Sequence, residues 1–96
     1  MRVLICYDVD TTDKPGARRL RRIAEACKDH GVRVQYSLFE CQLQAPAWIQ
    51  LRRKLLDLFE SQTDSLRFYF FGEDEVQKTE HHGVRPPLDV SGPLLV

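Results

Sequence analysis

The sequence lacks the features that would place it in a membrane or outside the cell. No hydrophobic run approaches the length needed to span a bilayer, and no basic N-terminal region precedes an apolar stretch and a cleavage site. The three cysteines, Cys6, Cys27 and Cys41, are odd in number and far apart, and no C-x-x-C spacing suggests zinc binding or redox chemistry. We therefore expect a cytoplasmic protein whose cysteines are reduced core residues.

The chain also lacks the motifs of several enzyme classes. It has no glycine-rich phosphate loop, no serine nucleophile elbow and no visible Cys–His arrangement for nucleophilic catalysis. His81 and His82 are adjacent, but without nearby cysteines they are weak evidence for a metal site. These absences leave carboxylates and arginines as the side chains from which a functional site could be built.

The formal net charge is zero, but the charge is unevenly distributed. Residues 14–33 carry seven basic side chains against two acidic ones, whereas residues 61–96 carry six acids against three bases. Four arginines fall within residues 18–22, and guanidinium groups make bidentate contacts with phosphates. On the residues alone, a phosphate-binding surface and an ordinary solvated helix face are equally good interpretations of this cluster.

Hydrophobic periodicity predicts the first elements. The apolar run that ends at Asp8 is typical of a strand. After it, Thr12 or Asp13 can cap a helix, in which apolar residues recur at helical spacing. We expect that helix to end at Gly31 in a left-handed cap. Alternating residues then predict two strands joined by a tight turn at Tyr36-Ser37, although one long bent strand is the competing interpretation.

The second half repeats this pattern and defines the fold class. Pro46 opens a second helix that stops near Glu60, and residues 66–71 form the last clear strand. The order β-α-β-β-α-β predicts an α+β, ferredoxin-like fold with a four-stranded antiparallel sheet and both helices on one face. Apolar groups on the other face suggest a second copy as its cover, and therefore a homodimer.

We divide the chain into two parts at the end of this pattern. Residues 1–76 form the ferredoxin-like domain. Residues 77–96 begin with an extended linker up to Asp89 and end in an apolar segment over residues 90–96. We expect that segment to form a short C-terminal strand that docks on a sheet edge of the same chain or of its partner.

Asp8 is the strongest candidate for a catalytic or metal-binding residue. It shares a strand face with Leu4 and Cys6, and an acid on an apolar face must be solvated, hydrogen-bonded or bound to a cation. On the residues alone, a carboxylate bonded to the following turn is the favoured interpretation. The alternative is a ligand for Mg²⁺, which often uses one or two protein carboxylates when phosphates supply further oxygens. A two-fold axis could bring two copies of Asp8 together at such a site.

Several segments in the same order resemble the CRISPR-associated protein two family, the small partner of the CRISPR integrase. They are the strand end at Tyr7-Asp8-Val9, the arginine-rich helix, and residues 33–40, 64–69 and 89–96. The resemblance implies a ferredoxin-like homodimer in which Asp8 and its mate hold one Mg²⁺ near the two-fold axis. It also implies that basic side chains contact nucleic acid, namely Arg18, Arg19, Arg22 and Arg33.

The resemblance implies two functions of different class. One is a metal-dependent endonuclease that hydrolyses RNA or DNA, with Asp8 as the catalytic and metal-binding residue, and that partners the CRISPR integrase in spacer acquisition. The other is a non-catalytic scaffold that grips DNA for the integrase complex. No general base for the first is evident in the sequence. A ferredoxin-like regulatory module that binds a small ligand is a third possibility, but the missing glycine-rich loop and the excess of arginine argue against it.

Overall fold

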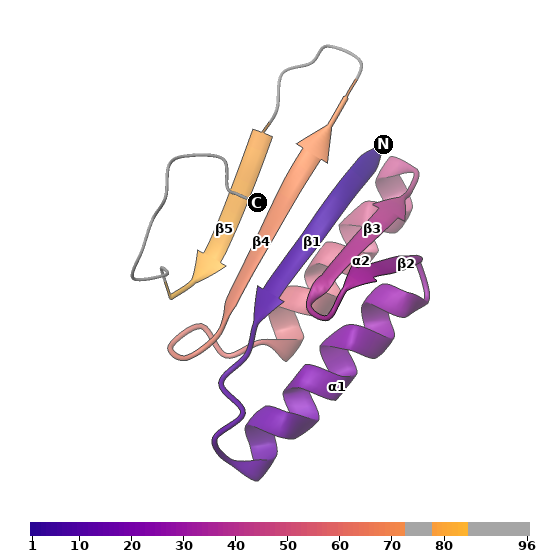
Figure 1. The fold of residues 1–96 in the computed structure, drawn as a ribbon. Helices are drawn as coiled ribbons and strands as arrows, with labels where there is room; N and C mark the ends of the chain where they lie inside the picture. The colour runs from indigo at the N-terminus through magenta and orange to yellow at the C-terminus, as the bar shows by residue number, and fades with distance from the viewer. Residues whose placement is uncertain (73–77, 85–96) are drawn as a thin grey trace.

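A computed structural model describes residues 1–72 and 78–84 of the chain (Figure 1). Its elements are, in order, β1 (Arg2–Asp8), α1 (Lys14–Lys28), β2 (Gly31–Gln35), β3 (Leu38–Gln42), α2 (Ala45–Leu58), β4 (Ser65–Phe71) and β5 (Lys78–Gly83). The strands form one sheet in the order β2-β3-β1-β4-β5, and every neighbouring pair is antiparallel. This arrangement confirms the predicted ferredoxin-like fold. Within the described ranges, no helix is long and apolar enough to cross a membrane.

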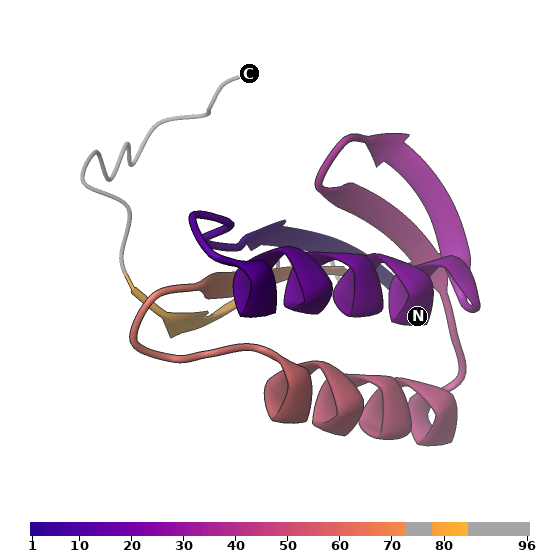
Figure 2. The same ribbon diagram turned by 90° about the horizontal axis from the view of Figure 1, so that it is seen from below.

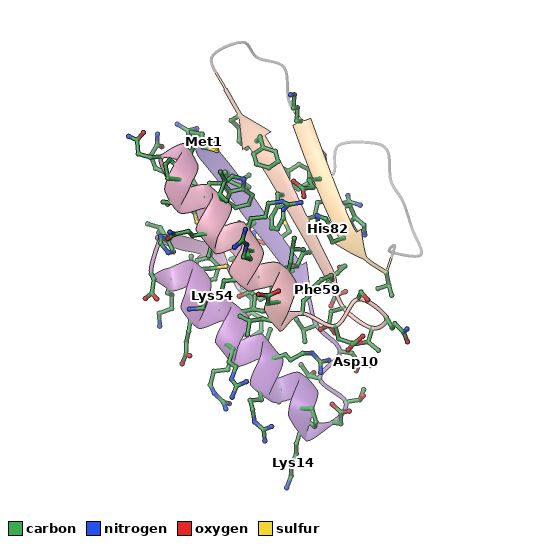
Figure 3. All side chains as sticks on the ribbon, turned by 180° about the vertical axis from the view of Figure 1, so that it is seen from behind. Met1, Asp10, Lys14, Lys54, Phe59 and His82 are labelled. Atoms are coloured by element: carbon green, nitrogen blue, oxygen red, sulfur yellow. The ribbon has the colours of Figure 1, made fainter. Side chains whose placement is uncertain are left out.

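Both helices cover the same face of the sheet, as Figures 2 and 3 show from two directions. Because side chains alternate along a strand, every second residue of β1 and β4 points into the layer between sheet and helices. The Trp48 ring of α2 packs edge-on against Phe68 and Phe70, with ring centroids 4.9 and 5.5 Å apart. Each such aromatic pair adds about 0.5–1.5 kcal/mol to the burial term. The fully buried side chains of this core include Val3, Ile5, Ile23, Phe39, Leu51, Leu55 and Leu66.

The opposite side of the sheet, which we call the open face, carries the residues of β1 and β4 that do not point towards the helices. Leu4 and Cys6 are half-buried there and Asp8 is exposed, which confirms the predicted sharing of one face by these three side chains. All three cysteines are free. Cys27 and Cys41 lie in the core as expected, but the prediction of a core position was wrong for Cys6, because the strand alternation turns it to the open face.

The start of α1 and the following hairpin largely follow the prediction. The Asp13 side chain caps α1 by accepting a hydrogen bond from the Gly16 N–H at 2.9 Å. The turn at residues 36–37 joins β2 to β3, so the single bent strand is excluded. Figure 2 shows this hairpin projecting away from the plane of the other strands.

The left-handed cap predicted at Gly31 was wrong. The helix ends at Lys28, and Gly31 is already the first residue of β2. A Cβ atom at this position would lie 2.5 Å from both the Cys41 Sγ and the Glu40 carbonyl oxygen. The glycine is needed because β2 and β3 approach each other closely there.

The structure has a fifth strand that the sequence did not predict. Residues Lys78–Gly83, predicted to belong to a linker, form β5 along the edge of β4. The strand is polar, so hydropathy gave no sign of it. It is stabilised by the ladder and by side-chain bonds on the helix side, where Arg52 Nε donates to Glu80 at 2.8 Å. The terminal strand predicted over residues 90–96 lies outside the described residues.

Candidate functional site

Asp8 lies at the carboxyl end of β1 with its side chain exposed on the open face. Its register partner on β4 is Ser65. A hollow of about 200 Å³ joins these two residues to side chains from three strands, β1, β4 and β5. Its remaining lining residues are Cys6, Tyr7, Arg67, Tyr69 and His81.

Arg67 is held in place inside this hollow by two neighbours. Its Nε donates to Nδ1 of His81 at 3.2 Å, and its Nη1 donates to the Tyr69 hydroxyl at 3.3 Å. Because Nδ1 of His81 accepts, the ring proton is on Nε2, which lies 2.9 Å from the Val84 carbonyl oxygen and donates to it. The sequence offered His81 only as weak evidence for a metal. The register of β5 on β4 would have placed it beside Arg67, but that strand was not recognised.

The arginines of α1 do not all face solvent. Arg18, Arg21 and Arg22 are exposed, whereas Arg19 turns towards the loop before β4. There its Nε and Nη2 donate to the Asp64 carboxylate at 2.8 and 3.2 Å. The structure therefore gives Arg19 a partner in its own chain and leaves Arg18 and Arg22 available to a polyanion.

Asp64 is a fully buried carboxylate with several hydrogen-bond donors. Besides Arg19, it accepts from the N–H groups of Asp10 and Glu60 and from the Thr63 hydroxyl, each at 3.0 Å. Burial alone would raise the pKa of this carboxyl, but the hydrogen bonds from Arg19, the two backbone groups and Thr63 outweigh burial and lower it. The cluster ties the loop after Asp8 to α1 and to the start of β4.

Arg33 lies away from Asp8, on the helix-facing side of β2. Its guanidinium carbon is 5.1 Å from the Phe39 ring centroid and 5.9 Å from that of Tyr36, within the range of cation–π attraction. A second hollow, of about 280 Å³, separates this hairpin from α1 and is also lined by Arg21 and Lys28. The structure thus brings Arg33 together with two cations that were not predicted as site residues.

A single chain offers little to a metal ion. Within residues 1–72 and 78–84, no group of three or more His, Cys, Asp or Glu side chains could hold one. The carboxylates that form ion pairs in those ranges are Glu40, Asp64 and Glu80, so Asp8 is left to solvent. Asp8 and Ser65 are oxygen donors of the kind Mg²⁺ prefers, but they supply only one carboxylate. A magnesium site at Asp8 fits this chain if a second copy contributes its own Asp8.

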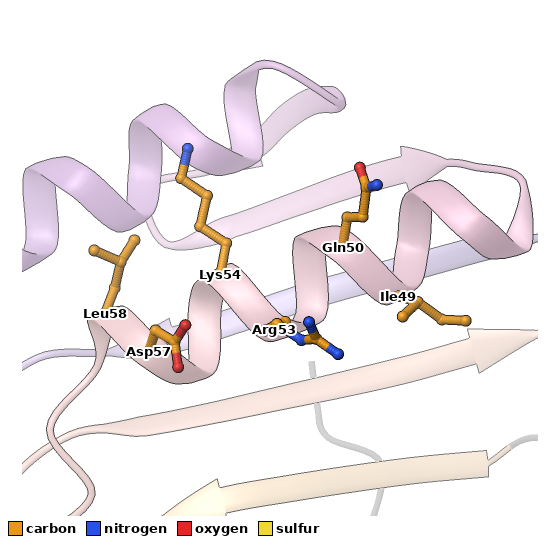
Figure 4. A pocket seen from close by; sticks show the side chains of 6 residues that line it. All are labelled: Ile49, Gln50, Arg53, Lys54, Asp57 and Leu58. Carbon is orange, nitrogen blue, oxygen red and sulfur yellow. The ribbon is translucent and has the colours of Figure 1, made fainter.

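A third hollow, of about 350 Å³, runs along the outer surface of α2 (Figure 4). It is lined by Ile49, Gln50, Arg53, Lys54, Asp57 and Leu58. All of these residues come from one helix, so no second wall supplies converging groups, and we assign no site there. Arg52, on the same helix, pairs with Glu80 of β5.

Comparison with known proteins identifies the family. The family model described as CRISPR associated protein Cas2 matches residues 1–79. The chain is 47% identical over 96 residues to the CRISPR-associated endoribonuclease Cas2 of Chlorobaculum tepidum, with 100% of both chains covered. It is 49% identical over 96 residues to the protein of that name in Nitratidesulfovibrio vulgaris, covering 100% of this chain and 94% of the relative.

A solved structure supports the same assignment. The crystal structure of Streptococcus pyogenes Cas2 at pH 6.5 matches with a TM-score of 0.70 and 40% sequence identity, covering 77% of this chain and 89% of that chain. The two relatives span the whole chain, including the strand that ends at Asp8, the arginine-rich helix and the sheet that carries the hollow. The chain therefore belongs to the CRISPR associated protein Cas2 family.

Proposed function

We propose that this chain is a CRISPR adaptation protein that acts as a homodimer and hydrolyses phosphodiester bonds of RNA or DNA with Mg²⁺. The observation that carries the proposal is the exposed Asp8 carboxylate on the open face, in one hollow with Arg67. A carboxylate beside a fixed cation is a suitable environment for a metal-bound phosphate. The endoribonuclease names of the two relatives support this class of reaction.

The open face supports the homodimer. Leu4, Cys6, Tyr69 and Phe71 are only half-buried in the isolated chain, although all are apolar or aromatic. A second copy that covers this face through a two-fold axis would bury them and bring the two Asp8 side chains towards each other. Two carboxylates in one site repel unless a cation lies between them, so dimer formation and metal binding would favour each other.

The residues of the chain would have separate roles. When bound, Mg²⁺ polarises a phosphoryl oxygen and acidifies a coordinated water. The two Asp8 carboxylates would hold the ion and fix its position on the open face. Arg18 and Arg22 would hold the nucleic-acid backbone by its phosphates without reading its sequence. Arg19 would support this arrangement indirectly, through Asp64.

The catalytic proposal is tested with Asp8→Asn, which removes the charge and keeps the shape. We expect loss of Mg²⁺-dependent cleavage of labelled RNA and DNA of matched sequence, with the folded state retained because Asp8 is exposed. Asp57→Asn is the control, since Asp57 is an exposed carboxylate on α2. Cleavage by Asp8→Asn at the wild-type rate would rule out Asp8 as the metal ligand.

A non-catalytic scaffold for the CRISPR integrase is the second candidate. It is favoured by the lack, among the described residues, of any group of three or more metal-binding side chains, and by the exposure of Arg18 and Arg22 on α1. If it is right, Asp8→Asn supports spacer acquisition with the integrase subunit as well as the wild type does. Arg18→Gln and Arg22→Gln together would then impair acquisition. Running nuclease and acquisition assays on the same variants separates the two functions.

A further inference from the structure

We propose that the hollow between α1 and the β2–β3 hairpin binds one unpaired nucleotide of a single-stranded nucleic acid. In this site the base stacks on the ring of Tyr36, and Arg21 and Lys28 hold the phosphate beside it. The choice of nucleic acid as the ligand rests on the proposed function. The existence of the site rests on the exposure of Tyr36, on the charge of the hollow and on the way the hairpin is held.

Tyr36 is the most exposed large hydrophobic side chain in the described ranges, with an exposed fraction of 80%. It lies in the turn at residues 36–37, in the hairpin that projects from the plane of the other strands (Figure 2). Its ring also lines the hollow next to α1. Proteins that bind single strands use exposed rings of this kind, because every base has a face that can stack on them. The turn therefore offers a stacking surface to an unpaired base.

Contacts with neighbouring residues fix the position of this turn. The Tyr7 N–H donates to the Ser37 carbonyl oxygen at 3.2 Å, and the Tyr7 hydroxyl donates to the Tyr36 carbonyl oxygen at 3.5 Å. Because Tyr7 is buried in β1, these two bonds tie the turn to the sheet. Arg33 flanks the Tyr36 ring, with its guanidinium carbon 5.9 Å from the ring centroid. A ring held in this way loses less conformational entropy on binding than a ring on a free loop, and this favours binding.

The hollow beside the turn carries an excess of positive charge. Among the described residues that line it, Arg21, Lys28 and Arg33 are basic and Glu25 is the one acid. Arg21 and Lys28 lie seven positions apart on α1, which is about two helical turns, so they project from one side of the helix. Both types of cation bind phosphate, arginine through its planar fork and lysine as a point charge. The charge of the hollow therefore suits a phosphate.

The size and position of the hollow suit one nucleotide better than a duplex. Its volume of about 280 Å³ is near the lower end of the range of small-ligand sites, about 300–1,000 Å³. Ala17, Leu20 and Ala24 add apolar atoms to its lining. Its walls are α1 and the helix-facing residues Tyr7 and Arg33, so it lies on the side of the sheet away from the open face. A second copy that covers the open face leaves this hollow accessible.

The hollow also lies next to the arginines that are proposed to hold the nucleic-acid backbone. Arg18 and Arg22 are about one turn apart on α1, and Arg21 directly precedes Arg22. A strand held by its phosphates at Arg18 and Arg22 would therefore pass close to the hollow. Unpaired bases can be turned outwards and stacked on aromatic side chains, whereas a duplex keeps its bases paired inside and offers none to Tyr36. The site thus selects single-stranded segments without reading their sequence.

The direct test is a titration of the wild-type chain, labelled with ¹³C at tyrosine and tryptophan, in EDTA so that no strand is cleaved. The probes are hexathymidylate, hexauridylate, an abasic strand of the same length and a blunt duplex. We expect the Tyr36 ring resonances to shift saturably with at least one of the two single strands, because a stacked base changes the magnetic environment of the ring. The resonances of Trp48, in the core, should stay in place.

Three results of this titration would overturn the proposal. The first is the absence of a Tyr36 shift with both single strands. The second is an equal shift with the abasic strand or the duplex, which would show attraction of phosphates without stacking. The third is a shift that follows protein concentration instead of added strand, which would assign the hairpin to a contact between copies of the chain.

Affinities of variants at Tyr36 give a second readout. Tyr36→Ala should weaken binding of the single strand about 5-fold to 100-fold, the usual effect of removing a ring on which a base stacks. Its affinity for the blunt duplex should change much less. Tyr36→Phe keeps the ring and should bind the single strand as the wild type does. Equal affinities of Tyr36→Ala and Tyr36→Phe for the single strand would contradict stacking.

The phosphate contact is tested by salt dependence. Replacing Arg21 and Lys28 together by Gln leaves one phosphate without its cations, so the slope of log K against log salt for the single strand should become less negative by roughly 0.7. Lys54→Gln, at an exposed position on α2, is the control and should leave the slope unchanged. An unaltered slope in the double variant would overturn the assignment of a phosphate to this hollow.

The outcomes separate this inference from the proposed function. If the wild type cleaves neither RNA nor DNA but the Tyr36 resonances respond to a single strand, catalysis is wrong and the nucleotide site stands. If the wild type cleaves and the Tyr36 resonances do not respond, the nucleotide site is wrong and the function stands. If Tyr36→Ala does not fold, the titration of the wild type decides alone.

Discussion

The buried Asp64 carboxylate accepts two hydrogen bonds from the Arg19 guanidinium, at 2.8 Å from Nε and 3.2 Å from Nη2. The same carboxylate accepts from the Asp10 N–H, two residues beyond Asp8. The Arg19–Asp64 pair therefore fixes the path of the chain after β1. Through it, Arg19, which is also predicted to contact nucleic acid, helps to fix the strand end that carries Asp8.

Removing the Asp64 carboxylate should destabilise the fold strongly. Asp64→Ala leaves the half-buried Arg19 without its counter-charge and two backbone N–H groups without an acceptor. We expect a loss of about 3 kcal/mol in the free energy of unfolding, as for other broken buried pairs. Urea unfolding at pH 7 measures it. Asp57→Ala, at an exposed site on α2, should change stability by less than about 0.5 kcal/mol; equal effects of the two would refute this role.

Stability should fall in acid because of the same carboxyl. Folding lowers the pKa of Asp64 below its ordinary value of 3.8, so the folded state holds the charged form more tightly than the unfolded state does. The resulting stabilisation is complete above that ordinary value and is lost as the pH falls towards the folded pKa. The pKa of Glu80 is also lowered, and its effect has the same sign. Melting temperatures between about pH 5 and about pH 2 should drop less steeply for Asp64→Asn than for the wild type, and parallel curves would contradict this.

The close approach of β2 to β3 makes Gly31 sensitive to substitution. In Gly31→Ala the new methyl group would meet the Cys41 Sγ and the Glu40 carbonyl oxygen. Overpacking of this kind costs about 1–3 kcal/mol. Gly72→Ala is a matched control, because no atom of the described residues lies within 4 Å of a Cβ at that position. Thermal unfolding of the two variants should therefore differ clearly, and similar melting temperatures would count against this packing.

Binding of duplex DNA should depend on Arg18 and Arg22 and on salt. Each substitution to Gln leaves one DNA phosphate without its arginine, so the slope of log K against log salt should become less negative by roughly 0.9 for each such phosphate. Fluorescence anisotropy at several salt concentrations measures this slope. Arg53→Gln, on α2, should leave the slope unchanged. An unaltered slope in the Arg18→Gln and Arg22→Gln variants would remove α1 from the binding surface.

The thiols should react slowly in the folded protein. Burial raises the pKa of Cys27 to about 12 and also raises the pKa of Cys6 and Cys41, so little thiolate is present at neutral pH. A colorimetric thiol reagent at pH 8 should label all three quickly in denaturant and none quickly in the native state. Rapid native labelling of Cys27 would show that the core opens near α1.

Local sequence patterns were enough to predict the βαββαβ core and the face on which Asp8 projects. Period-two alternation in β1 specifies both, because it separates core from open-face positions within the strand. Helical spacing likewise identified α1. It could not distinguish Arg19 from Arg18 and Arg22, because the partner of Arg19 is 45 positions away in sequence.

β5 could not be predicted from local sequence patterns. Its residues are polar, and their strand conformation depends on the ladder with β4 and on the bond between Arg52 and Glu80. Such pairing is non-local and leaves no hydropathy signal. His81, the neighbour of Arg67 on β5, was therefore missing from the predicted site.

The alternation of side chains along β1 and β4 determines which positions can be substituted without disturbing the core. Odd positions of β1 and even positions of β4 build the interior, whereas Cys6, Asp8, Ser65, Arg67 and Tyr69 lie on the opposite side. Substitutions on that side can alter the proposed site while the interior stays intact. A one-residue insertion within β1 would instead exchange the two sets, and it would disrupt folding and chemistry at once.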